Sequence, residues 1–256
     1  MSLLSRLFSR SSVRVRAQAP ASVTTRPDPD RPVWVIGDVH GCDRLLGQLL
    51  DRIAAARAET PADLVLVGDY IDRGDDSRAV LARLPDLDAV CLLGNHERMM
   101  FDFLDDPLTR GNRWLRYGGL QTLASFGIGG VTETTQGEKL ERAADALRTA
   151  MGQEMLRWLR DRPLQWTSGT LTVVHAAADP QMPLNAQSDE VLLWGHPDFL
   201  SLPRTDGAWV AHGHTIVPEA GADAQGRIAV DTGAYMTRRL TAALISPDGT
   251  VTLEQN

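Results

Sequence analysis

The sequence predicts an α/β fold, because short apolar segments alternate with helical ones and each apolar segment ends at a cluster of polar residues. Five apolar runs have the length of buried strands, at residues 33–36, 64–67, 90–93, 171–174 and 208–211. Motifs rich in Gly, Asp, Asn and His follow these runs directly. Side chains at strand ends sit on a rigid sheet, where loops can carry function. We therefore expect a single domain with its functional site at the strand ends.

The remaining elements are predicted from periodicity and turn residues. A segment of about residues 101–166 separates the third and fourth apolar runs and is expected to be a helical insert. Within it, a short helical stretch is expected to end near Gly127, and a longer helix is expected over 137–162. Residues 227–230, 240–245 and 250–253 are expected to be meander strands with a turn at 247–249. Helical spacing is shown by Leu140, Ala144, Leu147, Met151 and Met155.

The first 31 residues differ in composition from the rest, being rich in Ser, Arg and Pro with no acidic residue before Asp28. We expect a disordered tail, and the alternative is a short amphipathic helix at residues 3–8 that binds a membrane surface or a partner weakly. This apolar stretch is shorter than a secretory signal requires. The chain has no run of about 18 apolar residues, so no transmembrane segment is expected. The prediction is a cytoplasmic protein with a catalytic domain at residues 32–256.

Composition agrees with a globular enzyme. The chain has 256 residues, of which 43% are hydrophobic, enough for a sizeable core. Its net charge is −7 although five arginines and no acidic residue lie before Asp28, so the body is strongly acidic, which argues against nucleic acid as a partner. Cys42 and Cys91 lie in apolar surroundings and are expected to be reduced and buried. The sequence does not indicate the oligomeric state.

The polar motifs combine carboxylate, amide and imidazole side chains. They are GDVHG at residues 37–41, GDYIDRG at 68–74 and GNHE at 94–97, followed by His175 and by His212-Gly213-His214. Oxygen and nitrogen ligands without a thiolate suit Mn, Fe or Zn, and they include more nitrogen than Mg or Ca usually prefer. The sequence therefore predicts a site for divalent metal ions.

Two such ions roughly 3.5–4 Å apart can share a carboxylate and a water, whose lowered pKa makes it hydroxide near neutral pH. This hydroxide would attack phosphorus in line with the leaving oxygen. Arg73 offers a planar, bidentate donor for the phosphoryl oxygens. A histidine held by an aspartate would supply the proton of the leaving group, and His96 with Asp72 fits those roles.

Together the motifs resemble those of the metal-dependent phosphoprotein phosphatases, and more narrowly their bacterial Ser/Thr branch within the calcineurin-like metallophosphoesterase superfamily. The resemblance covers about residues 33–253. It implies a central β-sandwich of two mixed sheets flanked by helices. It also implies two divalent ions, with Mn expected and Fe, Zn or Mg as alternatives.

The resemblance also assigns roles to individual residues. It implies that Asp38 and His40 bind the first ion and that Asp69 bridges the two. It implies Arg73 as phosphate clamp, His96 as general acid and Asp72 as the orienting partner of that acid. The second ion would be bound by Asn95, His175 and His214, and Asn95 would also contact phosphate. Asp231-Thr232-Gly233 would lie near the site without binding metal.

One segment departs from the pattern of the family. Bacterial members often have Leu-Leu-Trp-x-Arg, in which the Arg is a second phosphate contact, whereas here the segment 192–196 ends in His196. Imidazole is a weaker donor whose charge depends on pH. Three alternatives stay open: His196 binds phosphate in its charged form, Arg204 or another residue reaches the site, or there is no second clamp. Trp114 and Arg116 in the insert are candidates for substrate specificity.

Two further residues of the motifs, one histidine and one glutamate, are expected to have structural rather than catalytic roles. His212 lies two residues from His214 and is expected to be structural or a neighbour of the site. Glu97 is expected to cap or pair with nearby groups, not to act as a base.

Three functions fit the sequence. The first is a protein Ser/Thr phosphatase. The second is a hydrolase of dinucleoside polyphosphates or small phosphoesters, whose members tend to lack the second Asp of GDxxDRG, so Asp72 favours the first. The third is a non-catalytic scaffold with this fold, a class that typically loses ligands or the acid, which this chain keeps.

Overall fold

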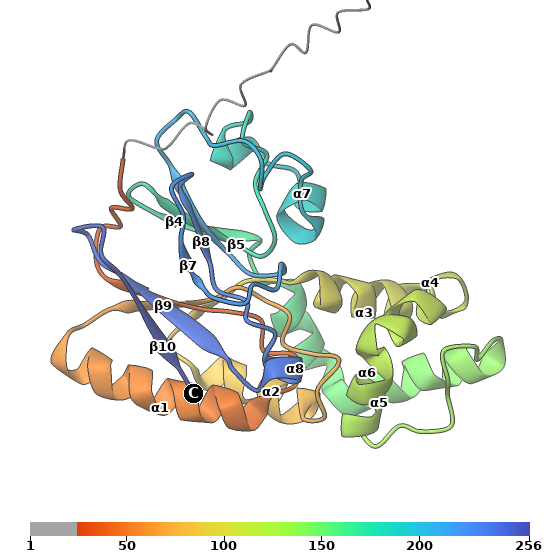
Figure 1. Ribbon diagram of the computed structural model, residues 1–256. Coiled ribbons are helices and arrows are strands. Elements are labelled where there is room, and N and C mark those ends of the chain that lie inside the picture. The colour runs from red at the N-terminus through yellow and green to blue at the C-terminus, as the bar shows by residue number, and fades with distance from the viewer. Residues whose placement is uncertain (1–24) are drawn as a thin grey trace, which may run out of the picture.

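A computed structural model describes residues 25–256, which form two five-stranded sheets packed face to face with helices outside (Figure 1). The strand order is β10-β9-β1-β2-β3 in the first sheet and β4-β5-β6-β8-β7 in the second. Both sheets mix parallel and antiparallel pairs, which confirms the predicted α/β sandwich. The first sheet contains β1 (Val33–Ile36), β2 (Asp63–Leu66), β3 (Val90–Cys91), β9 (Thr241–Ile245) and β10 (Val251–Gln255). The second contains β4 (Gln165–Ser168), β5 (Leu171–Val174), β6 (Trp209–His212), β7 (Gly221–Ala222) and β8 (Arg227–Ala229).

The parallel strands determine where the site lies. In the first sheet β1 runs parallel to β2 and β2 to β3, and in the second β5 runs parallel to β6 and β6 to β8. The carboxyl ends of parallel neighbours meet at one edge of a sheet. The two sheets therefore bring the motifs after β1, β2 and β3 to the motifs after β5 and β6.

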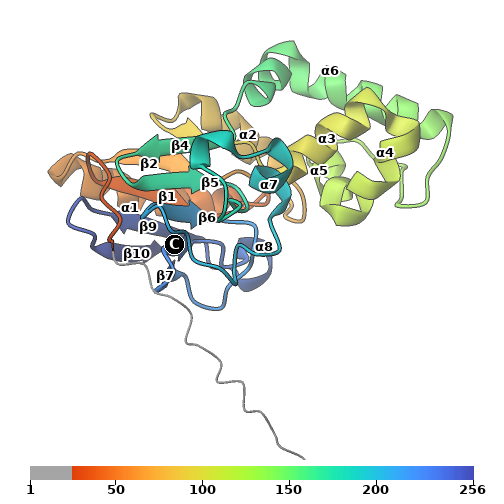
Figure 2. The same ribbon diagram turned by 90° about the horizontal axis from the view of Figure 1, so that it is seen from above.

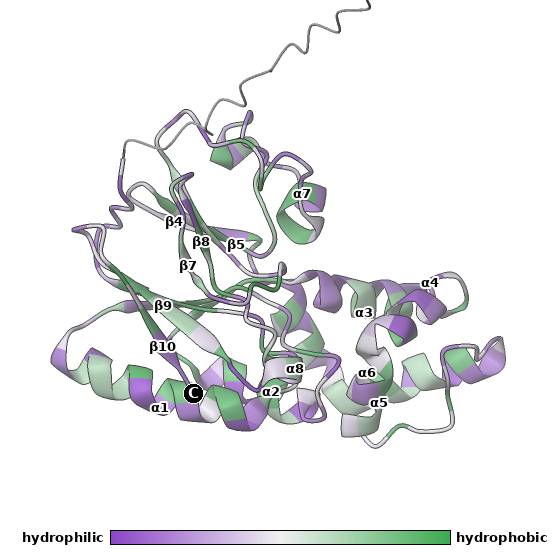
Figure 3. Cartoon of the chain, viewed as in Figure 1, coloured by the Kyte–Doolittle hydropathy of each residue, from purple (hydrophilic) through white to green (hydrophobic). Residues whose placement is uncertain are grey.

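Alternating side chains of each strand build separate cores, as a pleated strand requires. Val33 and Val35 of β1 pack between the two sheets, whereas Trp34 and Ile36 pack against the helices. Figure 3 shows apolar residues concentrated along the strands and alternating with polar ones along α1 (Asp43–Glu59). A third, smaller cluster lies between the second sheet and α7 (Asp189–Trp194).

The predicted helical insert lies beside the sandwich (Figure 2). Its longest helix, Glu138–Arg160, confirms the helix expected over 137–162, although Gly152 at φ 76 breaks its regular geometry. The helix ending near Gly127 is also confirmed, because α5 ends at Ser125. The insert contains α3 (Asn95–Asp105), α4 (Pro107–Trp114), a π-turn (Leu115–Gly119), α5 (Leu120–Ser125) and α6 (Glu138–Arg160). The other helices are α2 (Ser77–Arg83) and α8 (Ala234–Thr237), with 3-10 turns at Leu84–Asp86 and Leu184–Ala186.

Some boundaries differ from those expected. The third strand has only two residues, because α3 begins at Asn95 and the chain must turn before it. The strands β4 and β7 were not anticipated from the sequence. The first of them begins at Gln165, inside the segment assigned to the insert, and its composition lacks a clear apolar alternation.

The described chain begins against the sandwich. The backbone amides of Asp28 and Asp30 donate hydrogen bonds to the hydroxyls of Thr170 (2.9 Å) and Ser168 (2.9 Å). Asp28 and Asp30, which the composition had placed in the tail, therefore bind side chains of the β4–β5 hairpin. The expected amphipathic segment at residues 3–8 lies outside the described residues. Between residues 25 and 256, no helix has both the length and the apolar character needed to span a membrane.

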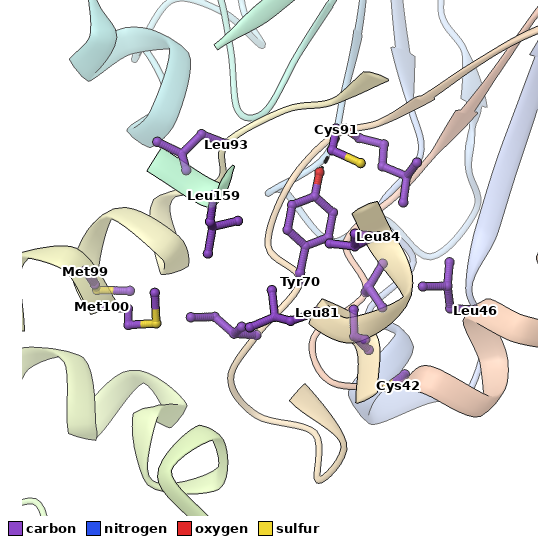
Figure 4. Packing of buried hydrophobic residues seen from close by; sticks show 14 of the residues in the cluster. Cys42, Leu46, Tyr70, Leu81, Leu84, Cys91, Leu93, Met99, Met100 and Leu159 are labelled. Atoms are coloured by element: carbon purple, nitrogen blue, oxygen red, sulfur yellow. Dashed lines mark hydrogen bonds between the residues drawn. The ribbon is translucent and has the colours of Figure 1, made fainter. Parts of the chain in front are cut away.

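Both cysteines are buried free thiols, as expected. Burial raises the pKa of Cys42 and that of Cys91 to about 11, which disfavours the reactive thiolate. Figure 4 shows Cys91 in the apolar core near the ring of Tyr70. Neither thiol is suited to act as a nucleophile.

Candidate active site

Asp69, which follows β2, is at the centre of the site. Its Oδ1 lies 3.5 Å from Nε2 of His175, and its Oδ2 lies 3.6 Å from Nε2 of His40. It forms one compact group with His40 and His96 and a second with His175 and His214, each with ligand atoms within 4.8 Å of one another. The two carboxylate oxygens therefore face two different sets of nitrogens, which is the geometry that a bridging carboxylate requires.

The predicted second-ion ligands lie together. Oδ1 of Asn95, the first residue of α3, lies 2.8 Å from Nε2 of His175 and 2.9 Å from Nδ1 of His214. Nδ1 of His175 lies 3.1 Å from the carbonyl oxygen of Val67, to which it can donate. That hydrogen bond would leave the Nε2 lone pair of His175 directed at Asn95 and Asp69, as a metal-binding imidazole needs.

Of the residues predicted to bind the first ion, His40 lies in a compact group with Asp69, whereas Asp38 lies outside that group. Nδ1 of His40 lies 2.8 Å from the carbonyl oxygen of Ile71, which leaves Nε2 directed at Asp69. Asp38 follows β1 and is buried, and both of its oxygens accept from the backbone amide of His214 at 3.1 Å. In the compact group around His40 and Asp69 the third ligand atom belongs to His96, not to Asp38. Asp38 thus lies near this group without belonging to it, and its role as a ligand stays a prediction, like the roles of the other five residues.

The electrostatics of the site favour bound cations. Burial raises the pKa of Asp38 well above its ordinary value, and the charges of Asp231 and Asp69 raise it further. Burial lowers the pKa of His40 to about 3 and that of His214 to about 4, so these imidazoles are neutral and can act as ligands. Buried carboxylates that repel one another beside neutral imidazoles fit divalent ions of the Mn, Fe or Zn type.

Backbone strain is concentrated at the same place. In residues 25–256, six non-glycine residues have positive φ, and all except Arg238 belong to the predicted site. Such conformations cost on the order of 1–3 kcal/mol each, and they cluster at functional sites. The five site residues are His40 (φ 43), Asp69 (φ 53), Asp72 (φ 72), Arg73 (φ 67) and His214 (φ 61).

Two motif glycines are required because carboxylates lie against their backbone. A Cβ on Gly94 would lie 2.2 Å from Oδ1 of Asp69, and a Cβ on Gly213 would lie 2.0 Å from Oδ1 of Asp38. Any side chain at either position would displace a carboxylate from the centre.

Glu97 organises the loop that carries Asp69. Its carboxylate accepts hydrogen bonds from the backbone amides of Asp69 (2.9 Å), Tyr70 (2.8 Å), Ile71 (3.2 Å) and Gly94 (3.0 Å). The side chain of Tyr70 points into the core (Figure 4) and its hydroxyl donates to the carbonyl of Leu92 at 2.8 Å. As expected, Glu97 pairs with nearby groups, and the bonds it makes leave it no free position as a base.

We expect Glu97→Gln to lower the free energy of unfolding by about 2–4 kcal/mol, because an amide nitrogen would face buried backbone donors. Urea unfolding in the presence of a chelator would measure this loss without a contribution from metal. Glu254→Gln is the matched control, since Glu254 makes only a surface ion pair with Arg52. Equal stability of the two variants would contradict the role of Glu97.

The predicted acid and its partner are in contact. Nδ1 of His96 lies 2.6 Å from Oδ2 of Asp72, and both residues are buried. Burial opposes protonation of His96, but the carboxylates of Asp69 and Asp72 outweigh it and raise the pKa of His96. Its Nε2 lies 3.9 Å from Oδ2 of Asp69 and therefore faces the centre.

Tyr235 of α8 is a neighbour of the site that the sequence analysis did not single out. Its ring lies 5.0 Å from the guanidinium carbon of Arg73 and packs edge-on against His40 with ring centroids 5.4 Å apart. The NH1 group of Arg73 lies 3.1 Å from Nε2 of His40, which places the predicted phosphate clamp at the centre. The only sequence signal for Tyr235 is its position two residues after Gly233.

His196 and Arg204 have different surroundings. His196 lines a pocket with His214 and Thr215, so it is next to the site. Arg204 is buried, pairs with Asp206 and donates to the carbonyl of Asp179 at 2.9 Å. Because the guanidinium of Arg204 already binds these partners, Arg204 is not the second phosphate contact that His196 replaces in the sequence.

The exposure of the remaining candidates, Trp114, Arg116 and His212, shows which of them a substrate could contact. Trp114 is fully buried, so the expectation that it lines a substrate entrance is wrong. Arg116 is exposed and stays a candidate for substrate specificity. His212 is buried against Phe199, with ring centroids 4.9 Å apart, and is structural.

The sandwich and its carboxylate–imidazole centre are those of a metal-dependent phosphoesterase. Residues 31–218 match the family model described as calcineurin-like phosphoesterase. The chain belongs to this family of hydrolases.

Several known proteins are similar to this chain. Serine/threonine-protein phosphatase 2 of Salmonella typhimurium is 28% identical over 224 residues, covering 82% of this chain and 91% of that protein. Phosphatase 1 of the same organism is 40% identical over 90 residues, 35% of this chain and 39% of that protein. The symmetrical bis(5'-nucleosyl)-tetraphosphatase of Dechloromonas aromatica is 31% identical over 173 residues, 65% of this chain and 52% of that protein. Two of these matches thus span about half or less of the relative's length.

A solved structure provisionally assigned as a diadenosine tetraphosphatase has a TM-score of 0.62 at 22% identity, covering 92% of this chain and 98% of that one. This likeness supports the fold.

Proposed function

We propose that the protein is a metal-dependent phosphomonoesterase that acts on Ser/Thr-phosphorylated proteins. The observation that carries this proposal is the 2.6 Å contact between Asp72 and His96. A phosphoserine ester releases an alkoxide, which needs a proton as the bond breaks. A dinucleoside polyphosphate is cleaved at a phosphoanhydride bond, and the nucleoside phosphate that leaves is a stabilised anion that needs little protonation. An oriented acid is therefore better explained by an alkyl phosphoester.

Two divalent cations, with Mn expected, would supply a nucleophile from water at neutral pH and neutralise charge on the phosphoryl group. The residues that would hold them are Asp38, His40, Asp69, Asn95, His175 and His214. Arg73 and Asn95 would orient the phosphoryl oxygens. His96 would donate a proton from Nε2 to the leaving oxygen, while Asp72 holds its Nδ1.

A substrate panel tests the assignment. With Mn added, we expect kcat/KM on phosphoserine and phosphothreonine peptides to exceed that on diadenosine tetraphosphate by at least about tenfold. A phosphotyrosine peptide and an aryl phosphate complete the panel. The second candidate is a dinucleoside tetraphosphatase, which is favoured by the 31% identity to such an enzyme. A reversed ratio would establish that candidate in place of the first.

His196 is proposed as an additional phosphate contact beside the second set of ligands. Its Nδ1 accepts from the amide of Asp198 at 3.2 Å, and its Nε2 lies 3.8 Å from Oδ2 of Asp179. The pocket that it shares with His214 is open to a substrate oxygen.

We expect His196→Ala to raise KM about 3–10-fold with kcat changed less than about twofold, because one hydrogen bond made in both ground and transition states is lost. The inhibition constant of inorganic phosphate should rise in parallel. Unchanged KM and phosphate inhibition would leave His196 as a packing residue beside Trp194 and Pro197.

A further inference from the structure

Asp72 is held by more than its contact with His96. Its Oδ1 accepts from the hydroxyl of Thr122 at 2.6 Å, and its Oδ2 also accepts from Nε1 of Trp114 at 2.9 Å. The same Thr122 hydroxyl accepts from the backbone amide of Asp72 at 2.9 Å, and Ser77 Oγ does so at 3.1 Å. All of these groups are buried. Each oxygen of the Asp72 carboxylate therefore accepts a hydrogen bond from a donor other than His96.

Both donors come from the helical insert and are themselves immobilised. Trp114 ends α4 and stacks on Phe103 of α3, with ring centroids 4.9 Å apart and an interplanar angle of 25°. The stacked ring cannot turn its N–H away from Asp72 without losing this contact. Thr122, in α5, also lies 3.2 Å from the hydroxyl of Ser77.

The break between α4 and α5 makes this arrangement possible. Trp114 and Thr122 are eight residues apart, so a straight α-helix would separate them by about 12 Å along its axis, too far to bind one carboxylate. The π-turn with Gly118 at φ 114 interrupts the helix. The carbonyl of Gly118 accepts from the amide of Arg73 at 3.4 Å, and a Cβ there would lie 2.6 Å from that nitrogen. The turn therefore packs directly on Asp72 and Arg73.

We propose that Trp114 and Thr122 are positioning residues for proton donation, and that the helical insert completes the acid through them. They fix the Asp72 carboxylate so that one lone pair of Oδ2 meets Nδ1 of His96, which keeps Nε2 directed at the centre. Without them the carboxylate can rotate and the imidazole loses its fixed direction. This inference rests on the proposed role of His96 as general acid.

Turnover of two substrates tests it. We expect Trp114→Phe, which keeps the stacking on Phe103, and Thr122→Val each to lower kcat on a phosphoserine peptide about tenfold with KM little changed. On an aryl phosphate, whose leaving group needs little protonation, the loss should stay below about threefold. Trp158→Phe and Thr172→Val are matched controls, since Trp158 packs on Arg162 and the hydroxyl of Thr172 pairs with Thr167. Equal losses on both substrates, or none, would overturn the proposal.

Measuring His96→Asn on the same two substrates distinguishes failure of the positioning role from failure of the proposed acid. If it shows the leaving-group dependence and the Trp114 and Thr122 variants do not, the positioning role fails while the proposed acid stands. If His96→Asn lacks this dependence too, the assignment of the acid fails and the inference fails with it.

A spectroscopic measurement needs no turnover. In protein labelled with ¹⁵N, the Trp114 indole resonance is identified by its loss in Trp114→Phe. We expect Asp72→Asn to shift this resonance and to speed exchange of its proton with solvent, because an amide is a weaker acceptor than a carboxylate. A resonance that does not change in Asp72→Asn would overturn the hydrogen bond on which the proposal depends.

Discussion

Asp69→Asn is expected to abolish nearly all turnover, by roughly 10³-fold or more, because a neutral amide cannot offer one anionic oxygen to each of two cations. In the structure the two oxygens of Asp69 face His175 on one side and His40 on the other. An amide would present its oxygen to one set and its nitrogen, a donor, to the other. Its loss of negative charge would also weaken the attraction for both ions.

The measurement combines metal analysis with kinetics. We expect the wild type to bind two divalent ions per chain, to lose turnover under chelation and to recover best with Mn. Asp69→Asn should hold fewer than two ions tightly. Asp63→Asn is the matched control, since Asp63 is a surface partner of Arg31 at the other end of β2. Two tightly held ions together with normal activity in Asp69→Asn would contradict the bridging assignment.

The part of this site that could be predicted is the part encoded locally. A motif directly after a buried strand must appear at the sheet edge, so Asp38, Asp69 and Asn95 could be placed from the apolar runs before them. Their convergence with His175 and His214 requires that the two sheets face each other, which came from the resemblance and not from periodicity. The structure confirms that convergence.

What could not be predicted depends on distant packing. Trp114 looks like a residue of an amphipathic helix, and nothing local indicates that its indole N–H binds Asp72, which lies 42 residues earlier in the chain. Glu97 could be expected to pair locally, but its bonds to the amides of residues 69–71 require the loop to fold over α3. The positive φ of Asp69 could not be predicted, because aspartate adopts such conformations more often than most non-glycine residues but still does so at a small minority of positions.

His96→Asn is expected to lower kcat on phosphoserine peptides by roughly 10²–10⁴-fold, the usual contribution of a general acid. The physical reason is that serine alkoxide is a poor leaving group, and asparagine has no proton to give it. Asparagine retains a donor close to the Nδ1 position, so the contact with Asp72 and the fold should survive. The metal content should therefore change little.

The decisive comparison is between leaving groups. An aryl phosphate releases a stabilised anion that needs little protonation, so the loss in His96→Asn should be much smaller for it than for the peptide. Asp72→Asn should show a milder version of the same pattern, because it leaves the imidazole in place but weakens the 2.6 Å contact that orients it. Equal losses on both substrates with both ions still bound would remove His96 from the role of acid. The buried pair would then be structural, and the proton of the leaving group would have to come from water.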